Sequence, residues 1–442
     1  MKLQTRTIVA LLLLLVFLPS TAQNADRQAL SLMAEGQPFA LRKLLDQQGD
    51  SLSKGAKALA EAYVKGCLGD ASHAARDMRR ALKKHTALID PQLAQQLTFG
   101  TALQYHRAGK DRKAARTLAK YRQRLSMDSV HDSVSSGWQR TFHNYEQLYS
   151  ICRKHRQEVL CPGEASVPFR MDSVGAKDAR SVAIRILSVV NGRQATFMLD
   201  TGSSLNVVSR VMADSLRLQM LGVSVFFDGM GENCGQMALA KLVSMGNIVI
   251  RNVLFCVIDS PIDSNSSDES TAHLNAILGW PLLEAFGEVQ LDFLTHVIKA
   301  TARKTMKTTK NTDEMVNLCY GFSDNGVLVE VFHHGQPVRL IPDTGATHSV
   351  LSTADAPAQR DYIMSSFTSR EVELVGWGGR KTGREYLYPQ YDVAVGKVVV
   401  SLPVMSVFDG SDYDSRLGMD FFSRCERVLF RLSAPMRMSV IR

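Results

Sequence analysis

An eight-residue pattern occurs twice in this sequence and constrains its fold more than any other feature. Residues 197–204 and residues 340–347 each consist of an apolar run, the sequence Asp-Thr-Gly and then small residues. Each copy places one acid, Asp200 or Asp343, in a tight turn whose glycine relieves crowding. A single copy is typical of a surface loop, because aspartate, threonine and glycine are ordinary turn residues. The second copy therefore indicates a duplicated β structure.

The residues around the two turns repeat as well. The matched landmarks are Gly192 and Gly335, each eight residues before an acid, Gly246 and Gly396, each 13 residues before an aspartate, and the Ile-Leu-Gly and Arg-Leu-Gly sequences at 277–279 and 416–418. The first four glycines lie next to runs of alternating polarity, as glycines in hairpin turns do. A half-unit of β-strands that occurs twice accounts for this spacing.

These motifs resemble those of the aspartic peptidases. Ala346 and the short halves are more similar to the retroviral-type (retropepsin-like) branch than to pepsin, and the resemblance covers residues 165–442. It implies an all-β bilobed domain with pseudo-twofold symmetry, in which Asp200 and Asp343 form a catalytic dyad. The other residues that it places at the dyad are the inward hydroxyls of Thr201 and Thr344, the tight-turn glycines Gly202 and Gly345, and Gly279 and Gly418 beneath the acids.

Side chains next to the dyad carry further expectations. Ser203 is expected to donate a hydrogen bond from its hydroxyl to Asp200, whereas Ala346 has no such group to offer Asp343. The expected result is an asymmetric pair in which Asp343 is protonated more often. His348 is either a third catalytic group or a neighbour of the cleft wall, and its position on the strand that leaves the turn favours the second role.

Glycine-rich hairpin tips lie downstream of each acid and are the predicted flaps over a substrate. The flap candidates are Gly229, Gly231, Gly376 and Trp377. Substrate binding would need an extended peptide held beneath these tips by main-chain hydrogen bonds, as in strand addition. Trp377 either covers the cleft or packs between the hairpin and the core, and the sequence leaves both roles open.

Two carboxyl groups within hydrogen-bond reach hold one proton between them and titrate as a unit. One then takes a proton from a bridging water while the other polarises the scissile carbonyl. The expected function is therefore that of an aspartic endopeptidase on a peptide or protein substrate, with no metal and no cofactor. Both acids lie in one chain, so a monomer is expected. The alternative is a catalytically silent bilobed binding or adaptor protein that acts through its helical domain.

The first 22 residues are interpreted as a signal peptide. Lys2 and Arg6 precede an apolar run at residues 8–18, which is too short to span a bilayer, and a small-residue cleavage site follows near Ala22. An uncleaved anchor is the alternative interpretation. No later stretch is apolar and long enough for a membrane span, so a protein exported to the periplasm or the extracellular space is expected.

Residues 24–157 have the composition and periodicity of paired helices. Glycine is rare and alanine is abundant. The residues 5, 9 and 12 positions after Gly69 (Ala74, Met78 and Ala81) are matched after Gly109 by Ala114, Leu118 and Tyr121. The pattern resembles tetratricopeptide-type repeats, although the separation of 40 residues exceeds the usual repeat length. This predicted helical-repeat domain either docks a protein partner or masks the cleft.

Composition suggests the remaining boundaries. The predicted segments are a connector at 158–180, a first aspartic-peptidase-like lobe at 181–302, a linker at 303–315 and a second lobe at 316–442. The formal net charge of +9 is spread along the chain, which favours a solvated surface over nucleic-acid binding.

Seven cysteines leave at least one thiol unpaired within the chain. Cys152 and Cys161 flank the connector and are the candidates for a bridge, with unpaired thiols as the alternative. Cys256 and Cys425 lie in apolar strand-like runs, where buried unpaired thiols are expected.

Overall fold

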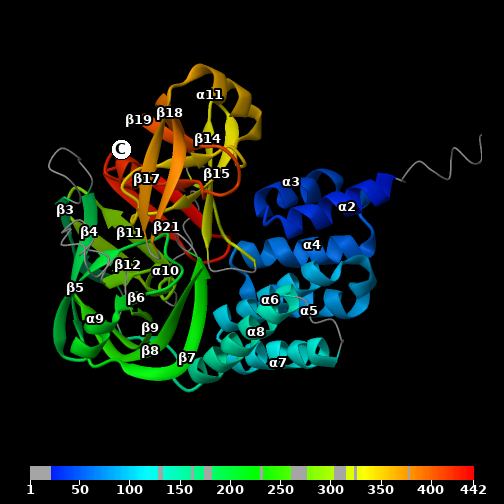
Figure 1. Cartoon of the computed structure of the whole chain (residues 1–442), viewed down its shortest axis with the longest axis horizontal. Helices are drawn as coiled ribbons and strands as arrows, with labels where there is room; N and C mark the ends of the chain where they lie inside the picture. Colours follow the sequence, from blue (N-terminus) through cyan, green and yellow to red (C-terminus); the bar gives the residue numbers. More distant parts are fainter. Residues whose placement is uncertain are drawn as a thin grey trace, which may run out of the picture. The chain divides into compact units, whose positions relative to one another are not determined.

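The computed structural model describes residues 21–127, 133–160, 164–173, 182–228, 232–259, 276–302, 315–322, 326–376 and 379–442 (Figure 1). The chain forms two compact units. The helical unit extends to Thr117 and includes Gly321–Asp324, and the β-rich unit comprises Leu118–Tyr320 and Asn325–Arg442. The predicted fold class, an N-terminal helical region followed by a β-rich bilobed region, is confirmed.

The helical unit consists of helices joined by tight turns. Its elements are α2 (Thr21–Ala34), α3 (Pro38–Gln48), the 3₁₀ helix η1 (Gly49–Ser51), α4 (Lys54–Cys67), α5 (Ala71–His85), the 3₁₀ helix η2 (Thr86–Leu88), α6 (Pro91–Arg107) and the first turns of α7 (Asp111–Met127). Ser53, Asp70 and Asp90 cap α4, α5 and α6, each accepting a hydrogen bond from an amide three residues further on. Gly69 and Gly109 follow α4 and α6 with φ angles of 94° and 68°, which glycine adopts without strain.

One aromatic side chain from a distant part of the sequence completes the core of the helical unit. Phe322 is 1% exposed and stacks on Tyr63, with ring centroids 4.7 Å apart. Its ring lies against Gly66 of α4 and Gly100 of α6, and a Cβ atom on either glycine would come within 3 Å of the ring. Arg107 donates a hydrogen bond to the carbonyl of the residue before Phe322, at 3.2 Å.

The last helix before the strands belongs to the β-rich unit. This is α8 (Ser133–Cys152). Its residues Leu148 and Cys152 share a buried apolar cluster with Val223 and Val225 of β7 (Gln219–Asp228). The end of the helical region therefore packs with strands.

The first sheet has nine strands among the described residues. They are β1 (Glu158–Val159), β3 (Arg170–Ser173), β4 (Val182–Val190), β5 (Arg193–Leu199), β6 (Val207–Ser209), β7, β8 (Glu232–Met245), β9 (Ile248–Ile258) and β10 (Ala276–Leu278). Their order is β1-β9-β6-β10-β5-β4-β8-β7, with β3 beside β4. The helices α9 (Arg210–Ser215) and α10 (Trp280–Leu283) follow β6 and β10. This sheet forms the first half of the β-rich unit.

The second sheet has 13 strands among the described residues. They are β2 (Glu164–Pro168), β11 (Glu288–Asp292), β12 (Val297–Thr301), β13 (Val316–Tyr320), β14 (Val327–His333), β15 (Gln336–Pro342), β16 (Val350–Ser352), β17 (Ser369–Gly376), β18 (Gly379–Val395), β19 (Val398–Phe408), β20 (Arg416–Leu417), β21 (Arg427–Arg431) and β22 (Arg437–Ile441). Strands β14 to β20 form the second half, with the 3₁₀ helix η4 (Pro357–Gln359), α11 (Arg360–Ser366) and α12 (Met419–Phe422).

Equivalent strands of the two halves pair with each other. β11 and β21 are antiparallel, with Val289 opposite Phe430 and Leu291 opposite Val428. Antiparallel pairing of equivalent strands is compatible with a twofold axis between the halves. Trp280 packs in the same region, with its ring edge-on to that of Phe430 and the ring centroids 5.6 Å apart.

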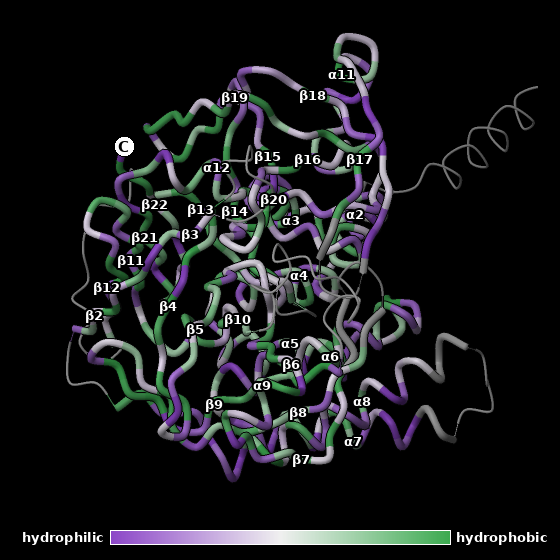
Figure 2. Tube along the Cα trace, turned by 60° about the vertical axis from the view of Figure 1, so that its left-hand side comes forward, coloured by the Kyte–Doolittle hydropathy of each residue, from purple (hydrophilic) through white to green (hydrophobic). Residues whose placement is uncertain are grey.

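Local signals in the sequence correspond to the observed turns. Gly192 and Gly335 connect β4 to β5 and β14 to β15 with φ angles of 82° and 77°. Figure 2 shows polar and apolar residues alternating along the strands, as expected where one face of a sheet is buried. Cys256 and Cys425 are buried and unpaired as predicted, and burial raises the pKa of each thiol to about 12.

Several predictions fall outside the described residues. They concern the signal peptide up to residue 20, the parts of the connector at 161–163 and 174–180, most of the linker at 303–315, and Cys161 with its bridge. Among the helices that the structure describes, none combines the length and apolar character that a membrane span requires.

Candidate active site

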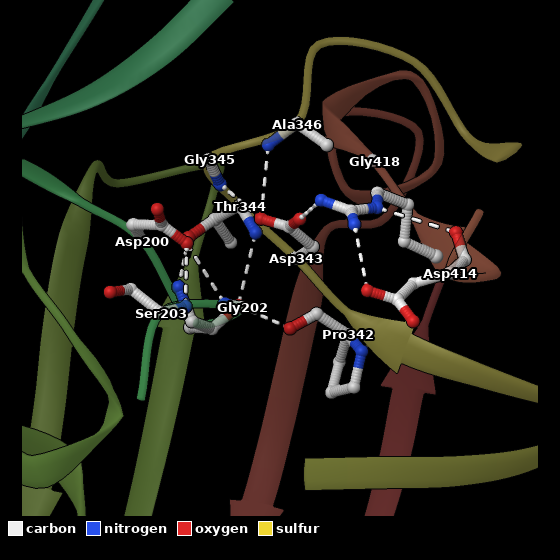
Figure 3. A network of polar contacts seen from close by, with 12 residues as sticks. Asp200, Gly202, Ser203, Pro342, Asp343, Thr344, Gly345, Ala346, Asp414 and Gly418 are labelled. Atoms are coloured by element: carbon white, nitrogen blue, oxygen red, sulfur yellow. Dashed lines mark hydrogen bonds and ion pairs between the residues drawn. The ribbon is translucent and has the colours of Figure 1, made fainter. Parts of the chain in front are cut away.

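The two acids occupy equivalent positions at the ends of equivalent strands (Figure 3). Asp200 follows β5, and its amide donates to the carbonyl of Leu278 in the neighbouring parallel strand β10 at 3.0 Å. Asp343 follows β15, and its amide donates to Leu417 in the parallel strand β20 at 2.9 Å. In each half, the main chain of the acid is therefore held by the parallel strand that lies beside the strand leading to the acid.

Each turn directs amide groups at its own carboxylate. Oδ1 of Asp200 accepts hydrogen bonds from the amides of Gly202 and Ser203, both at 2.9 Å. Oδ1 of Asp343 accepts the same pair of bonds from the amides two and three residues further on, at 2.8 and 3.0 Å. One oxygen of each carboxyl group is thus held in place by its own turn.

The two threonines lock the turns together. The amide of Thr201 donates to the hydroxyl of Thr344 at 3.1 Å, and the reverse bond is 3.0 Å. Each hydroxyl donates in turn to a carbonyl of the opposite half, Thr201 to Pro342 at 2.6 Å and Thr344 to Leu199 at 2.8 Å. Both side chains are 1% exposed, so this reciprocal network is shielded from water.

The glycines bring the acids face to face. A Cβ atom on Gly202 would lie less than 3 Å from the carboxyl carbon of Asp343, and one on Gly345 would lie equally close to that of Asp200. Each glycine is therefore packed against the acid of the other half. Only residues without a side chain allow this approach.

The two carboxyl groups lie close together, and this proximity perturbs the titration of Asp200. The pKa of Asp200 is raised well above its usual range, first by burial and then by the negative charge and hydrogen bond of Asp343. The positive charge of Arg416 and the amide of Ser203 act in the opposite direction, but the net shift is upward. The neutral form of Asp200 is thus favoured.

Arg416 is the one cation bound to the dyad among the described residues. Its Nη1 lies 2.9 Å from Oδ2 of Asp343, and its Nη2 lies 3.5 Å from Asp414. The expectation that Asp343 carries the proton more often is therefore corrected. The guanidinium group lies on Asp343, and the carboxyl group whose pKa is raised is that of Asp200, so we assign the shared proton to Asp200.

Ser203 does not act as predicted through its hydroxyl. Its Oγ donates to the carbonyl of Leu205 at 2.8 Å, and only its amide reaches Asp200. The side chain satisfies the local turn, which is what serine commonly does at such positions.

Equivalent polar residues beneath the acids were not singled out from the sequence. Asn206 accepts a hydrogen bond from the amide of Gly279 at 2.9 Å, and Ser349 accepts one from the amide of Gly418 at 3.0 Å. Both lie six residues after an acid, so the repeated spacing could have identified them. Ser349 in turn binds Asp420 through its hydroxyl at 2.7 Å.

The predicted flaps lie on two hairpins, β7–β8 and β17–β18. Gly376 ends β17 and pairs with Gly379. Gly229, Gly231 and Trp377 lie outside the described residues, so both roles of Trp377 stay open.

His348 is exposed, and its Nδ1 lies 2.9 Å from the hydroxyl of Thr347. Its role beside the cleft stays a prediction. Within the described residues, no group of three or more His, Cys, Asp or Glu side chains is placed to hold a metal ion.

Comparisons with solved structures find weak similarity. A retropepsin-like aspartic protease from Rickettsia conorii is 20% identical, with a TM-score of 0.21, and the match covers 34% of this chain and 94% of that one. Basic 7S globulin from soybean is 12% identical, with a TM-score of 0.36 and coverage of 63% and 94%. Conglutin gamma from lupine seeds is 11% identical, with a TM-score of 0.38 and coverage of 63% and 95%. Similarity at this level identifies neither a substrate nor an activity.

Comparison with curated proteins gives no significant match. The family model described as Aspartyl protease matches residues 187–282 and 329–421. The first match contains Asp200 and Gly279, and the second contains Asp343 and Gly418. The resemblance predicted from the duplicated turns is therefore confirmed: the aspartyl protease family model matches both halves of the β-rich region.

Proposed function

We propose that this protein is an aspartic-type endopeptidase that hydrolyses peptide bonds with water. The observation that carries the proposal is the pair of carboxyl groups of Asp200 and Asp343, each of which lies against the turn glycine of the other half beside a buried threonine network. Two acids so close hold one proton between them, and this gives the site one base and one acid.

The reaction needs only these two groups and a water molecule. The ionised carboxylate takes a proton from the water molecule while the oxygen of that water bonds to the carbonyl carbon of the substrate. The protonated acid meanwhile gives its proton to the carbonyl oxygen, which forms a tetrahedral diol. In the second step the acid that took the proton from water gives it to the amide nitrogen, and the other carboxylate takes a proton from one diol hydroxyl. The carbon–nitrogen bond breaks, and a carboxylic acid and an amine leave.

The hairpins β7–β8 and β17–β18 support binding of an extended peptide. Each is a long antiparallel ribbon, and β7 and β17 lie at the ends of the strand orders of their sheets among the described residues. Main-chain groups along such an edge can bind a peptide as an additional strand. The proposed substrate class is therefore an unfolded segment of a protein or a peptide.

A catalytically silent bilobed protein is the second candidate. The observation that favours it is the ion pair between Arg416 and Asp343, because it gives one acid a partner in the absence of substrate. Retention of both acids, both threonines and both turn glycines favours the enzyme.

Hydrolysis of a diverse peptide pool at several acidic pH values separates the two candidates. The intact protein should produce new peptide termini, and the Asp200→Asn and Asp343→Asn variants should each reduce the rate by at least about 10³-fold, because loss of a group that acts as part of a unit removes most of the catalysis. Asp361→Asn is the control, since that side chain is 97% exposed on α11. Comparable hydrolysis in either dyad variant would exclude the mechanism.

We also propose that the protein is exported as a monomer to the periplasm or the extracellular space. The apolar run at residues 8–18 and the small residues before Ala22 support this proposal. The amino-terminal residue of protein made in a secreting host tests it. A start near residue 23 agrees with cleavage, and retention of residue 1 contradicts it.

For the helical unit, we propose docking of a protein partner, in the manner of tetratricopeptide-like repeats. A mask over the cleft is the competing role. Removal of residues 24–117 leaves the turnover of short peptides unchanged if the unit recruits, and increases it if the unit masks. The deletion stops at residue 117 because α8 belongs to the β-rich unit.

A further inference from the structure

The two halves differ in charge at one equivalent position beside the acids. Ile277 in β10 pairs with Met198, and Arg416 in β20 pairs with Ile341, each two residues before the acid of its half. Ile277 is fully buried in an apolar cluster. The second half thus places a guanidinium group where the first places a hydrocarbon.

The contacts of Arg416 are selective for one acid. Its Nη1 binds Oδ2 of Asp343 at 2.9 Å, and its Nη2 is 3.5 Å from the carboxylate of Asp414. The side chains of Asp343, Arg416 and Asp414 are 5%, 31% and 73% exposed. The contact with Asp343 is therefore shielded, whereas the contact with Asp414 is open to water and correspondingly weak.

The hydrogen bonds of the two acids are consistent with different charge states. Asp343 accepts two amides on Oδ1 and a guanidinium on Oδ2, so both of its oxygens act as acceptors, as those of a carboxylate do. Oδ1 of Asp200 likewise accepts two amides, but among the residues that the structure describes no cation forms an ion pair with its second oxygen. A proton shared between the acids is therefore best held by Asp200.

We propose that Arg416 is a positioning residue of the dyad, which keeps Asp343 as the carboxylate that activates water and leaves the shared proton on Asp200. The inference rests on the proposed function. The charged groups around the pair are Asp200, Asp343, Asp414 and Arg416. Because Asp414 offsets Arg416 only through an exposed contact, the net effect of the cation is to favour ionisation of the pair.

A pH profile follows from this arrangement. The active pair carries one proton, so activity rises as the first proton leaves and falls as the second leaves. A cation beside the pair lowers both apparent pKa values. Arg416→Met, which keeps length without charge, should therefore move both limbs of the kcat/KM profile to higher pH, by about 1 to 3 units for a contact this close.

Arg416→Lys is the matched variant, because it keeps the charge but not the planar fork of donors. Its profile should lie between those of the native protein and Arg416→Met. If kcat/KM of Arg416→Met falls at every pH while both limbs of the profile stay at the same pH, Arg416 is merely structural and the inference is overturned. Increased activity without movement would make Arg416 a block on the site, and this result would also overturn it.

A readout without substrate keeps this test separate from that of the proposed function. The side-chain carboxyl carbons of Asp200 and Asp343 can be followed by NMR in protein with ¹³C-labelled aspartate, and the two asparagine variants assign the signals. The titration step at lower pH should appear mainly in the carboxyl signal of Asp343. Arg416→Met should move this step to higher pH and make the signals of the two acids change more equally. These shifts without hydrolysis would refute the endopeptidase but uphold the charge assignment. Hydrolysis with a first step reported mainly by Asp200 would overturn the charge assignment alone.

Discussion

Gly202 and Gly345 have no room for a side chain, because each lies against the acid of the other half. Gly202→Ala would insert a methyl group less than 3 Å from the carboxyl carbon of Asp343 and push the acids apart. A displacement of this kind should reduce kcat at least about 10²-fold while the protein still folds. Peptide hydrolysis measured beside a thermal melt checks this prediction.

Gly137→Ala is the control for Gly202→Ala. It lies in α8 with nothing within 4 Å of an added Cβ, so the substitution should leave kcat unchanged. Equal kcat in Gly202→Ala and Gly137→Ala would show that the close approach of the two halves has no catalytic importance.

At the scale of single elements, the helical unit depends on Phe322. The side chain fills the space over Gly66 and Gly100 and stacks on Tyr63. Phe322→Ala should reduce the free energy of unfolding of this unit by about 3 to 5 kcal/mol, the usual effect of emptying a buried aromatic site. Hydrogen exchange of the α4 and α6 amides measures the loss. Leu88→Ala is the control, since that side chain is 41% exposed, and equal exchange in the two variants would contradict the assigned role.

Elements built from local patterns could be predicted from the sequence, whereas contacts made by the fold could not. The turns at Gly192 and Gly335 follow from alternating runs around a glycine, and both occur as expected. Glycines inside α4 and α6 hinted at a close approach, because glycine destabilises a helix unless something packs against it. Nothing local identified Phe322 as the partner, since it lies more than 200 residues away.

The site shows the same division between local and long-range information. The acids, threonines and glycines were found because their spacing repeats. The sequence shows that Arg416 stands where the first half has Ile277. Its ion pair with Asp343 follows only from the structure, which places β20 beside β15. The hydroxyl of Ser203 was assigned to the wrong acceptor, because both Asp200 and Leu205 lie within its reach along the chain.

At the scale of the whole molecule, the dyad links stability to pH. The raised pKa of Asp200 means that the folded protein holds this proton more tightly than the unfolded chain does. The resulting stabilisation is fully present below the pKa of an unfolded aspartate, about 3.9, and is lost as pH rises through the folded value. Asp200→Asn should therefore melt at a higher temperature than the native protein at pH 7, with a difference that shrinks toward pH 4.

Asp343→Asn should behave in the opposite way. It leaves Arg416 without its carboxylate, so the melting temperature at pH 7 should fall. Thermal melts of both variants from pH 4 to 8 make the comparison. Equal shifts in the same direction would contradict the charge asymmetry of the pair.

The central claim is that folding unites Asp200 and Asp343 in one site within a single chain. Calorimetric titration with a statine-type inhibitor tests it most directly, because the hydroxyl of such a compound mimics the diol intermediate between the two carboxyl groups. The account predicts about one inhibitor bound per chain, with binding lost in both Asp200→Asn and Asp343→Asn. Absence of binding to the native protein, or undiminished binding to either variant, would contradict it.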